Sequence, residues 1–206
     1  MKCIVRSALL VAVVGAALMA GPGSARAHER DWRWREIDQR GVYIGFGGMA
    51  NFVVNQASAP VDGFISQGGG LNLFLGVRLA RMFALEAGYA LNVHNPVHDA
   101  WGATTSALLL HAATLDMKFI IPNPSPVRPF FQAGLGIYEL AGYPDNTDYR
   151  NGLGFQLGGG LDVYLNHVVS IGGRALYHGI SFTQDIGPNK PFLSTVSVEG
   201  NLQFHF

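Results

Sequence analysis

Charged side chains recur at isolated, alternate positions inside stretches of apolar and small residues. Asp116 and Lys118, for example, are two residues apart and flank Met117. Side chains two apart on an extended strand point to the same face, so such charges would share one face of a sheet. An unpaired charge in a narrow interior is expensive, which predicts that these groups pair in a network. The predicted lumen charge network consists of Arg78, Glu86, Asp116, Lys118, Asp162, Arg174 and Glu199.

The elements that carry these charges have the pattern of β-strands. From Gly41 to Phe206 the chain alternates with a period of two, and no stretch keeps a helical period for more than two turns. In the clearest case, residues 71–79, four leucines and one valine occupy the odd positions. The number of predicted strands is eight, which is even, so both termini of the barrel should lie on the same side of the membrane. The predicted strands cover 42–47, 71–79, 83–92, 113–121, 131–138, 153–164, 169–178 and 196–206.

Composition indicates which face meets the surroundings. The polar face is mainly Gly, Ser, Asn and Gln, and Lys118 and Lys190 are the only lysines after residue 27. The other face is aliphatic and aromatic, as in a lipid-facing band, where Lys or Arg near the midplane costs about 2–4 kcal/mol. The sequence therefore predicts an all-β, eight-stranded antiparallel up-and-down transmembrane β-barrel with a polar lumen. In such a lumen, serine at Gly76 or Gly158 should matter less than arginine at Leu75 or Leu157 on the lipid face.

The connections between the predicted strands alternate between short and long. Tight turns are expected at 80–82, 122–129 and 166–167, and longer polar loops at 55–63, 94–105, 139–151 and 183–192. Outer-membrane barrels have short periplasmic turns and longer extracellular loops, so the long connections are expected outside the cell. The turn at 80–82 would also place Arg78 and Glu86 close enough for a direct or diagonal cross-strand pair.

The N-terminus has the pattern of an export signal. Lys2 and Arg6 precede an apolar run over 8–20, and the small residues before position 28 fit a cleavage site. The expected division of the chain is a cleavable signal peptide at 1–27, a periplasmic lead-in at 28–40 and an outer-membrane β-barrel at 41–206.

Composition also narrows the partners and the chemistry. Cys3, the only cysteine, lies in the signal, so the mature protein should have no disulfide and no thiol chemistry. The 14 basic residues are scattered and balanced by 14 acidic ones, so nucleic-acid binding is not expected. The segment 28–40 mixes charges around Trp32 and Trp34; it is expected to be solvated, and the alternative is a tail that docks at the barrel mouth or the membrane surface.

Several segments together carry a family resemblance. They are VYIGFG at 42–47, ALEAGY at 84–89, LDMKF at 115–119, RPFFQAGLG at 128–136 and the closing Phe206. Together they resemble the small eight-stranded outer-membrane barrel superfamily, the OmpA-like and OmpX-like domains of porin-family proteins. This implies a place in the bacterial outer membrane, contact with its lipids, and recognition of the Phe206 strand by the barrel assembly machinery. The peptidoglycan-binding domain of OmpA-type proteins is not expected.

A weaker likeness suggests an enzyme. Residues 129–136, 174–178 and 188–189 are faintly similar to PagL-type lipid A deacylases. Those enzymes place a histidine and a serine two residues apart, whereas His178 and Ser181 are three apart and so on opposite faces of a regular strand. Glu199 could orient the histidine only through a bulge. No catalytic residue is therefore assigned, and His178 is expected to be a structural interior histidine.

The loops offer no established metal site. His94, His98 and Asp99 could bind a metal, but with Pro96 between them their spacing matches no ligand pattern. No metal or cofactor is assigned.

The predicted function is a non-enzymatic integral outer-membrane protein with a structural or surface-interaction role. Eight strands leave an interior about wide enough for side chains, which favours a lumen plugged by polar groups. A narrow porin-like channel for small solutes is the first alternative, and a lipid A-modifying enzyme is the second. The surface ligand and the oligomeric state stay open.

Overall fold

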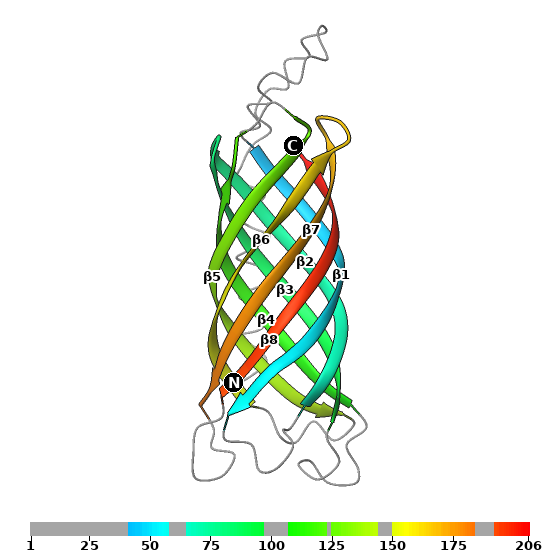
Figure 1. Ribbon diagram of the computed structural model, residues 1–206, viewed down its shortest axis with the longest axis vertical. Helices are drawn as coiled ribbons and strands as arrows, with labels where there is room; N and C mark the ends of the chain where they lie inside the picture. Colours follow the sequence, from blue (N-terminus) through cyan, green and yellow to red (C-terminus); the bar gives the residue numbers. More distant parts are fainter. Residues whose placement is uncertain (1–40, 58–64, 97–106, 123–124, 144–149, 184–191) are drawn as a thin grey trace, which may run out of the picture.

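Eight antiparallel strands form the part of the chain that the structure describes. The computed structural model describes residues 41–57, 65–96, 107–122, 125–143, 150–183 and 192–206. The strands are β1 (Gly41–Ala57), β2 (Ile65–Ala80), β3 (Phe83–Pro96), β4 (Ala107–Ile120), β5 (Val127–Tyr143), β6 (Arg150–Tyr164), β7 (Val169–Phe182) and β8 (Phe192–His205). They lie side by side in chain order, and β1 pairs with β8 to close the barrel (Figure 1). The predicted fold is confirmed.

The two ends of the barrel differ in their connections. Gly41 and Phe206 lie at one end together with the tight β2–β3 and β6–β7 turns, and we call this the terminal end. The β1–β2, β3–β4, β5–β6 and β7–β8 connections leave from the opposite end, which we call the loop end. The predicted alternation of short and long connections is only partly present, because the β4–β5 connection (121–126) and the β5–β6 connection (144–149) both have six residues.

Closure of the sheet decides where the backbone hydrogen bonds go. Every strand has a hydrogen-bonded neighbour on both sides, so the sheet has no edge. Without water to satisfy free N–H and C=O groups, a segment that crosses lipid must pair all of them internally. No helix in the described residues is long and apolar enough to cross a membrane.

Several strands extend further toward the loop end than the sequence indicates. β4 begins at Ala107 rather than at 113, and β5 continues to Tyr143, into the stretch predicted as a loop. The period of two is hidden over 107–110, because Leu108 and Leu110 are buried inside while Leu109 between them faces outward. The predicted loops at 94–105 and 139–151 are therefore shorter than expected.

The outer face of the barrel is apolar, as predicted. Leu135 on β5 is 71% exposed, whereas Gln132, three positions away on the inward face, is 1% exposed. Glu139, near the loop end, is the one charged residue on outward-facing positions of the described strands. A contiguous belt of this kind exceeds what a water-soluble monomer exposes, so it requires an apolar environment such as the bilayer core.

Several lumen glycines lie in close contact with rings and with backbone. A Cβ atom added at Gly76 would lie 2.1 Å from Cζ of Tyr43, and one at Gly45 would lie 2.2 Å from Cζ of Phe74. A Cβ atom at Gly158 would lie 2.0 Å from a carbonyl oxygen of β7. Glycine in this lumen makes room for rings and for close backbone approach. A side chain at Gly76 or Gly158 therefore meets a ring or a backbone carbonyl at close range, so serine at either position is expected to destabilise the barrel.

We expect Gly76→Ala to lower the free energy of unfolding by about 1–3 kcal/mol, because the new methyl group displaces the Tyr43 ring. Gly200→Ala is the matched control, since a Cβ atom there meets nothing within 4 Å; its effect should be neutral or slightly stabilising. Urea unfolding in phospholipid vesicles measures both. Equal midpoints for the two variants would show that the ring does not depend on the glycine.

Candidate functional site in the barrel lumen

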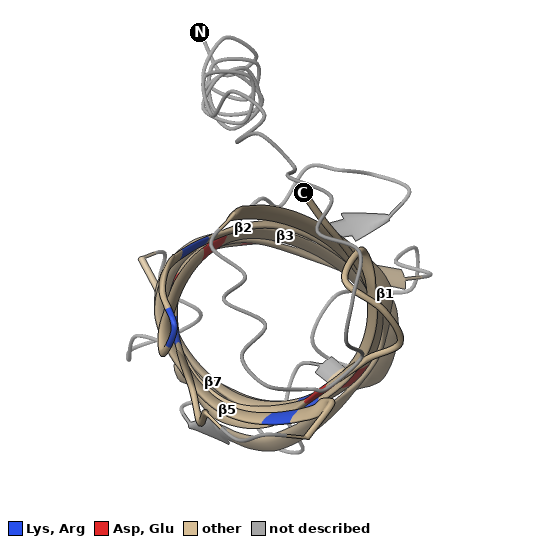
Figure 2. Cartoon of the chain, turned by 90° about the horizontal axis from the view of Figure 1, so that it is seen from above, with Lys and Arg blue, Asp and Glu red and all other residues tan. Residues whose placement is uncertain are grey.

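The inward-facing side chains form three layers along the barrel axis. An apolar layer lies toward the loop end, a charged layer in the middle, and a mainly aromatic layer toward the terminal end. In the view along the axis, charged residues are seen on the wall of the closed ring (Figure 2). The layers are built by alternate residues of all eight strands, because alternate residues of a barrel strand face inward.

Glu86 on β3 is the centre of the charged layer and is 1% exposed. Its Oε1 accepts a hydrogen bond from the Tyr43 hydroxyl at 2.6 Å and lies 3.2 Å from Lys118 Nζ. Its Oε2 accepts from Arg174 Nη1 at 3.1 Å and from Gln132 Nε2 at 3.3 Å. A carboxylate offers about four acceptor sites. The acceptor capacity of Glu86 is thus filled from β1, β4, β5 and β7.

Two further ion pairs extend this network. Lys118 Nζ lies 2.8 Å from Asp162 Oδ2 on β6, and Arg174 Nε lies 2.6 Å from Glu199 Oε2 on β8. Lys118 also lies over the Phe130 ring, 3.9 Å from its centroid. Each of the two cations bridges two carboxylates, which compensates the cost of burying it.

Amide side chains occupy further acceptor sites of the carboxylates. The donor–acceptor pairs are Asn72–Glu199, Gln156–Asp116 and Gln203–Asp162. Asp116 also accepts from Thr114 Oγ1 at 2.9 Å, and it forms no ion pair with a described residue. Neutral donors therefore add to the ion pairs at Glu199 and Asp162, and at Asp116 they take the place of a cation.

All seven residues predicted for the network lie on inward-facing positions, and ion pairs join five of them. The five are Glu86, Lys118, Asp162, Arg174 and Glu199. Arg78 lies apart, near the terminal end, and the expected Arg78–Glu86 pair is not formed between these described residues. In the β2–β3 register Glu86 is opposite Gly76 and Arg78 is opposite Ala84, and the Glu86 carboxylate is already occupied by other donors.

Two charged residues on inward-facing positions were missed from the sequence, Arg128 and, at the loop end of β6, Arg150. Arg128 is 4% exposed and faces inward from β5, because β5 begins at Val127, within the stretch predicted as a turn at 122–129. Its even spacing from Gln132 is the signal that could have placed it on the lumen face.

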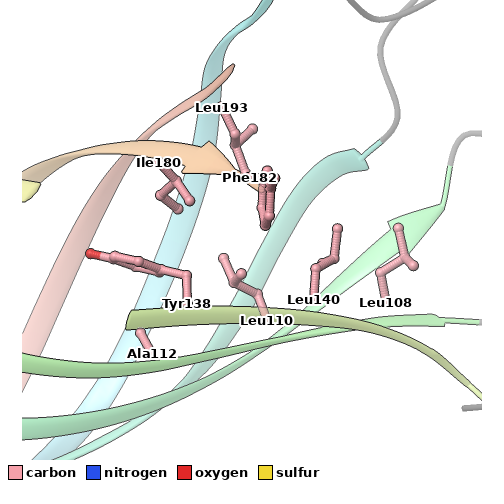
Figure 3. Close-up of a cluster of buried hydrophobic side chains, with 8 residues drawn as sticks. All are labelled: Leu108, Leu110, Ala112, Tyr138, Leu140, Ile180, Phe182 and Leu193. Carbon is pink, nitrogen blue, oxygen red and sulfur yellow. The ribbon is translucent and has the colours of Figure 1, made fainter. Parts of the chain in front are cut away.

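The apolar layer at the loop end was also missed. Its residues come from β4, β5, β7 and β8, and their side chains pack toward one another across the lumen (Figure 3). They are Leu108, Leu110, Ala112, Tyr138, Leu140, Ile180, Phe182 and Leu193. The lumen, predicted to be polar, is therefore apolar at this end. The sequence does not indicate this, because in β4 apolar inward residues are next to apolar outward ones and the period of two is not visible.

The terminal-end layer is mainly aromatic. It consists of Tyr43, Phe74, Ala84, Ile120 and Phe130, all buried. The Tyr43 and Phe74 rings meet edge to face with centroids 6.4 Å apart. This layer lies beneath the ion pairs, and its rings contact both Lys118 and Arg174.

A histidine, a serine and a glutamate do meet, inside the lumen. His178 Nε2 lies 2.9 Å from Ser197 Oγ, and that hydroxyl donates to Glu199 Oε1 at 3.0 Å. Ser181 is exposed on the outward side, so His178 and Ser181 are on opposite faces, as predicted. Beside His178, a cavity of about 30 Å³ is lined in part by Tyr138 and Glu199. It has room for one or two water molecules.

Of the three loop residues that could have bound a metal, His94 is the one that the structure describes. His94 is buried and its Nδ1 lies 2.8 Å from the Ser66 carbonyl oxygen. His98 and Asp99 lie outside the described residues. Within those residues no group of three His, Cys, Asp or Glu side chains could hold a metal ion.

Comparison with known proteins agrees with this geometry. The model of the outer membrane protein beta-barrel domain matches residues 8–206. Neisserial surface protein A is similar in structure, with a TM-score of 0.63 and 12% identity over 81% of this chain and 97% of that one. The outer membrane protein OprG from Pseudomonas aeruginosa is also similar, with a TM-score of 0.54 and 16% identity over 82% and 97%. No curated protein matches the chain significantly.

A double-mutant cycle tests the centre of the network. Glu86→Gln and Lys118→Met should each destabilise the barrel, by about 3–5 kcal/mol for a buried pair that loses one partner. The double variant should recover part of this, with a coupling energy of about 0.5–3 kcal/mol. Glu86→Gln combined with Arg150→Gln, at the loop end, should be additive. Additivity in both cycles, measured by urea unfolding in vesicles, would contradict the ion pair.

Proposed function

Because the chain belongs to the outer membrane protein beta-barrel domain family, we propose that it serves in the bacterial outer membrane as a non-conducting, non-enzymatic barrel. Its role is structural in the envelope, or it presents the loop end as an interaction surface. Binding sites in proteins concentrate on loops that a rigid scaffold positions, and a barrel held internally by ion pairs is such a scaffold.

The observation that carries this proposal is the filling of the lumen. Glu86 and Arg174 join residues from opposite walls at hydrogen-bond distance, and apolar or aromatic layers lie on both sides of them. The cavity beside His178 holds about 30 Å³, far less than a path through the barrel needs. These features argue against a porin-like channel, which requires a continuous aqueous lumen.

The same filling argues against a lipid A-modifying enzyme. Ser197 is fully buried and donates its hydrogen bond to Glu199, so it is neither accessible nor positioned with His178 acting as its base. An acyl chain could not enter the cavity beside it.

The barrel ends support the proposed orientation and partners. The apolar outer belt contacts the membrane lipids, and the terminal end faces the periplasm, as short turns do in bacterial barrels. Phe206 is 79% exposed, and its N–H donates to the Val42 carbonyl at the β8–β1 closure. This strand end is the one offered to the barrel assembly machinery. The predicted signal peptide at 1–27 and the predicted lead-in at 28–40 lie outside the described residues.

Planar-bilayer recording tests the sealed lumen. We expect the wild-type barrel to give no conductance steps and Glu86→Gln to stay silent, because the layers on both sides remain. The same variant should lower the thermal unfolding midpoint, followed by heat-modifiable gel mobility, since the network loses a charge. Glu139→Gln, on the outward face, is the control and should change the midpoint less. An unaltered midpoint together with altered ion selectivity in Glu86→Gln would overturn the plug in favour of a water-filled channel.

Cysteine labelling tests the orientation. Cysteines introduced at Asp99, Asp145 and Asn189, each in a connection at the loop end, should react with a membrane-impermeant reagent on intact cells. His167→Cys, exposed in the β6–β7 turn, should react only after permeabilisation. The reverse pattern would mean that the barrel is inserted with the opposite orientation.

A further inference from the structure

A buried acceptor without a donor lies in the wall of the cavity beside His178. Asn72 on β2 is 6% exposed, and its Nδ2 donates to Glu199. Its Oδ1 is buried and has no hydrogen-bond partner in the part of the chain that the structure describes. Asn72 and Glu199 both line the cavity of about 30 Å³. Because an unsatisfied buried carbonyl oxygen is costly, this atom indicates a ligand that oxygen lone pairs can bind.

Several donors around the cavity are directed toward Glu199 instead of into the cavity. The Ser197 hydroxyl donates to Glu199 Oε1 at 3.0 Å, so it accepts from His178 Nε2 at 2.9 Å. In a neutral imidazole the proton is then on Nε2, and Nδ1 accepts from the Tyr138 hydroxyl at 3.3 Å. Arg174 Nε donates to Glu199 Oε2 at 2.6 Å. These protons are therefore engaged, whereas the Tyr138 oxygen, which lines the cavity, keeps its lone pairs.

The charge next to the cavity also favours a cation. Asp116 forms no ion pair with a described residue, and its carboxylate accepts from Gln156 and Thr114, both of which line the cavity. A buried carboxylate without a counter-charge is expensive. The central layer as a whole contains two cations and four carboxylates: Lys118, Arg174, Glu86, Asp116, Asp162 and Glu199.

We propose that the cavity binds one small monovalent cation of the size of Na⁺, with Asn72 Oδ1 and the Glu199 carboxylate as ligands. Glu199 accepts three hydrogen bonds, which leaves about one of the roughly four acceptor sites of a carboxylate. The cavity has room for such a cation and about one water molecule. One carboxylate among neutral oxygens suits a single positive charge, and hard cations prefer oxygen ligands.

The layers on both sides hold this cation in place. The apolar layer lies toward the loop end and the ion pairs toward the terminal end, so the cation is bound in the lumen and not conducted. It supplies the positive charge that the central layer lacks. This goes beyond the proposed function, which assigns no ligand to the lumen.

The test compares sodium with choline, which is too large for a cavity of this volume. The barrel is refolded into maltoside micelles in sodium chloride or in choline chloride at equal ionic strength, so that the cation is present when the lumen closes. A ligand that binds only the folded state raises the unfolding midpoint. We expect the midpoint, followed by circular dichroism, to be about 2–4 °C higher in sodium. Equal midpoints would mean that water alone occupies the cavity and would overturn the proposal.

Variants locate the cation, and the quantity compared is the difference between the two salts, so a general loss of stability does not affect it. Asn72→Leu and Glu199→Gln each remove a ligand and should abolish the difference. Ala112→Val changes no polar group and fills the cavity from its apolar side, so it should abolish the difference even if the other two variants refold poorly. Asp162→Asn, which removes a carboxylate outside the cavity wall, is the matched control and should keep it. An undiminished difference in Asn72→Leu or Ala112→Val would overturn the site.

Discussion

The narrow bore of an eight-stranded barrel is the constraint on which the other features depend. Its interior is about wide enough for side chains, so a charge that leaves one wall meets groups from the opposite wall. Glu86 accepts hydrogen bonds from four other strands, and its bond with Arg174 joins residues 88 positions apart. The network therefore connects strands that share no backbone hydrogen bonds, which a ladder between neighbours cannot do.

The same narrow bore makes glycine and aromatic residues interdependent. The Tyr43 ring occupies the space above Gly76, and the Phe74 ring occupies the space above Gly45. Tyr43 then donates to Glu86, and the Phe74 ring lies 4.8 Å from the guanidinium of Arg174. A side chain added at either glycine would displace a ring that also contacts a charged residue, Glu86 for Tyr43 and Arg174 for Phe74. The aromatic layer and the charged layer are thus one packing unit.

Alternation with a period of two predicts the faces of the strands well, because each residue's side is fixed by its position alone. It does not predict which lumen groups meet, since that depends on how the strands are staggered around the barrel. Glu86 was expected to pair with Arg78 across the nearest turn, yet its partners come from β4 and β7. Leu108 and Leu110 were missed for another reason: an apolar inward residue beside an apolar outward one leaves no alternation to read.

The order of the layers also limits how strongly the two ends of the barrel can influence each other. Opening the lumen would require rearranging the apolar layer, the ion pairs and the aromatic layer, because each of them consists of buried side chains from several strands. A structural change at one end reaches the other end only through this middle layer. A network whose acceptors are filled has few alternative arrangements to shift between. Changes at the loop end and at the terminal end should therefore be energetically independent.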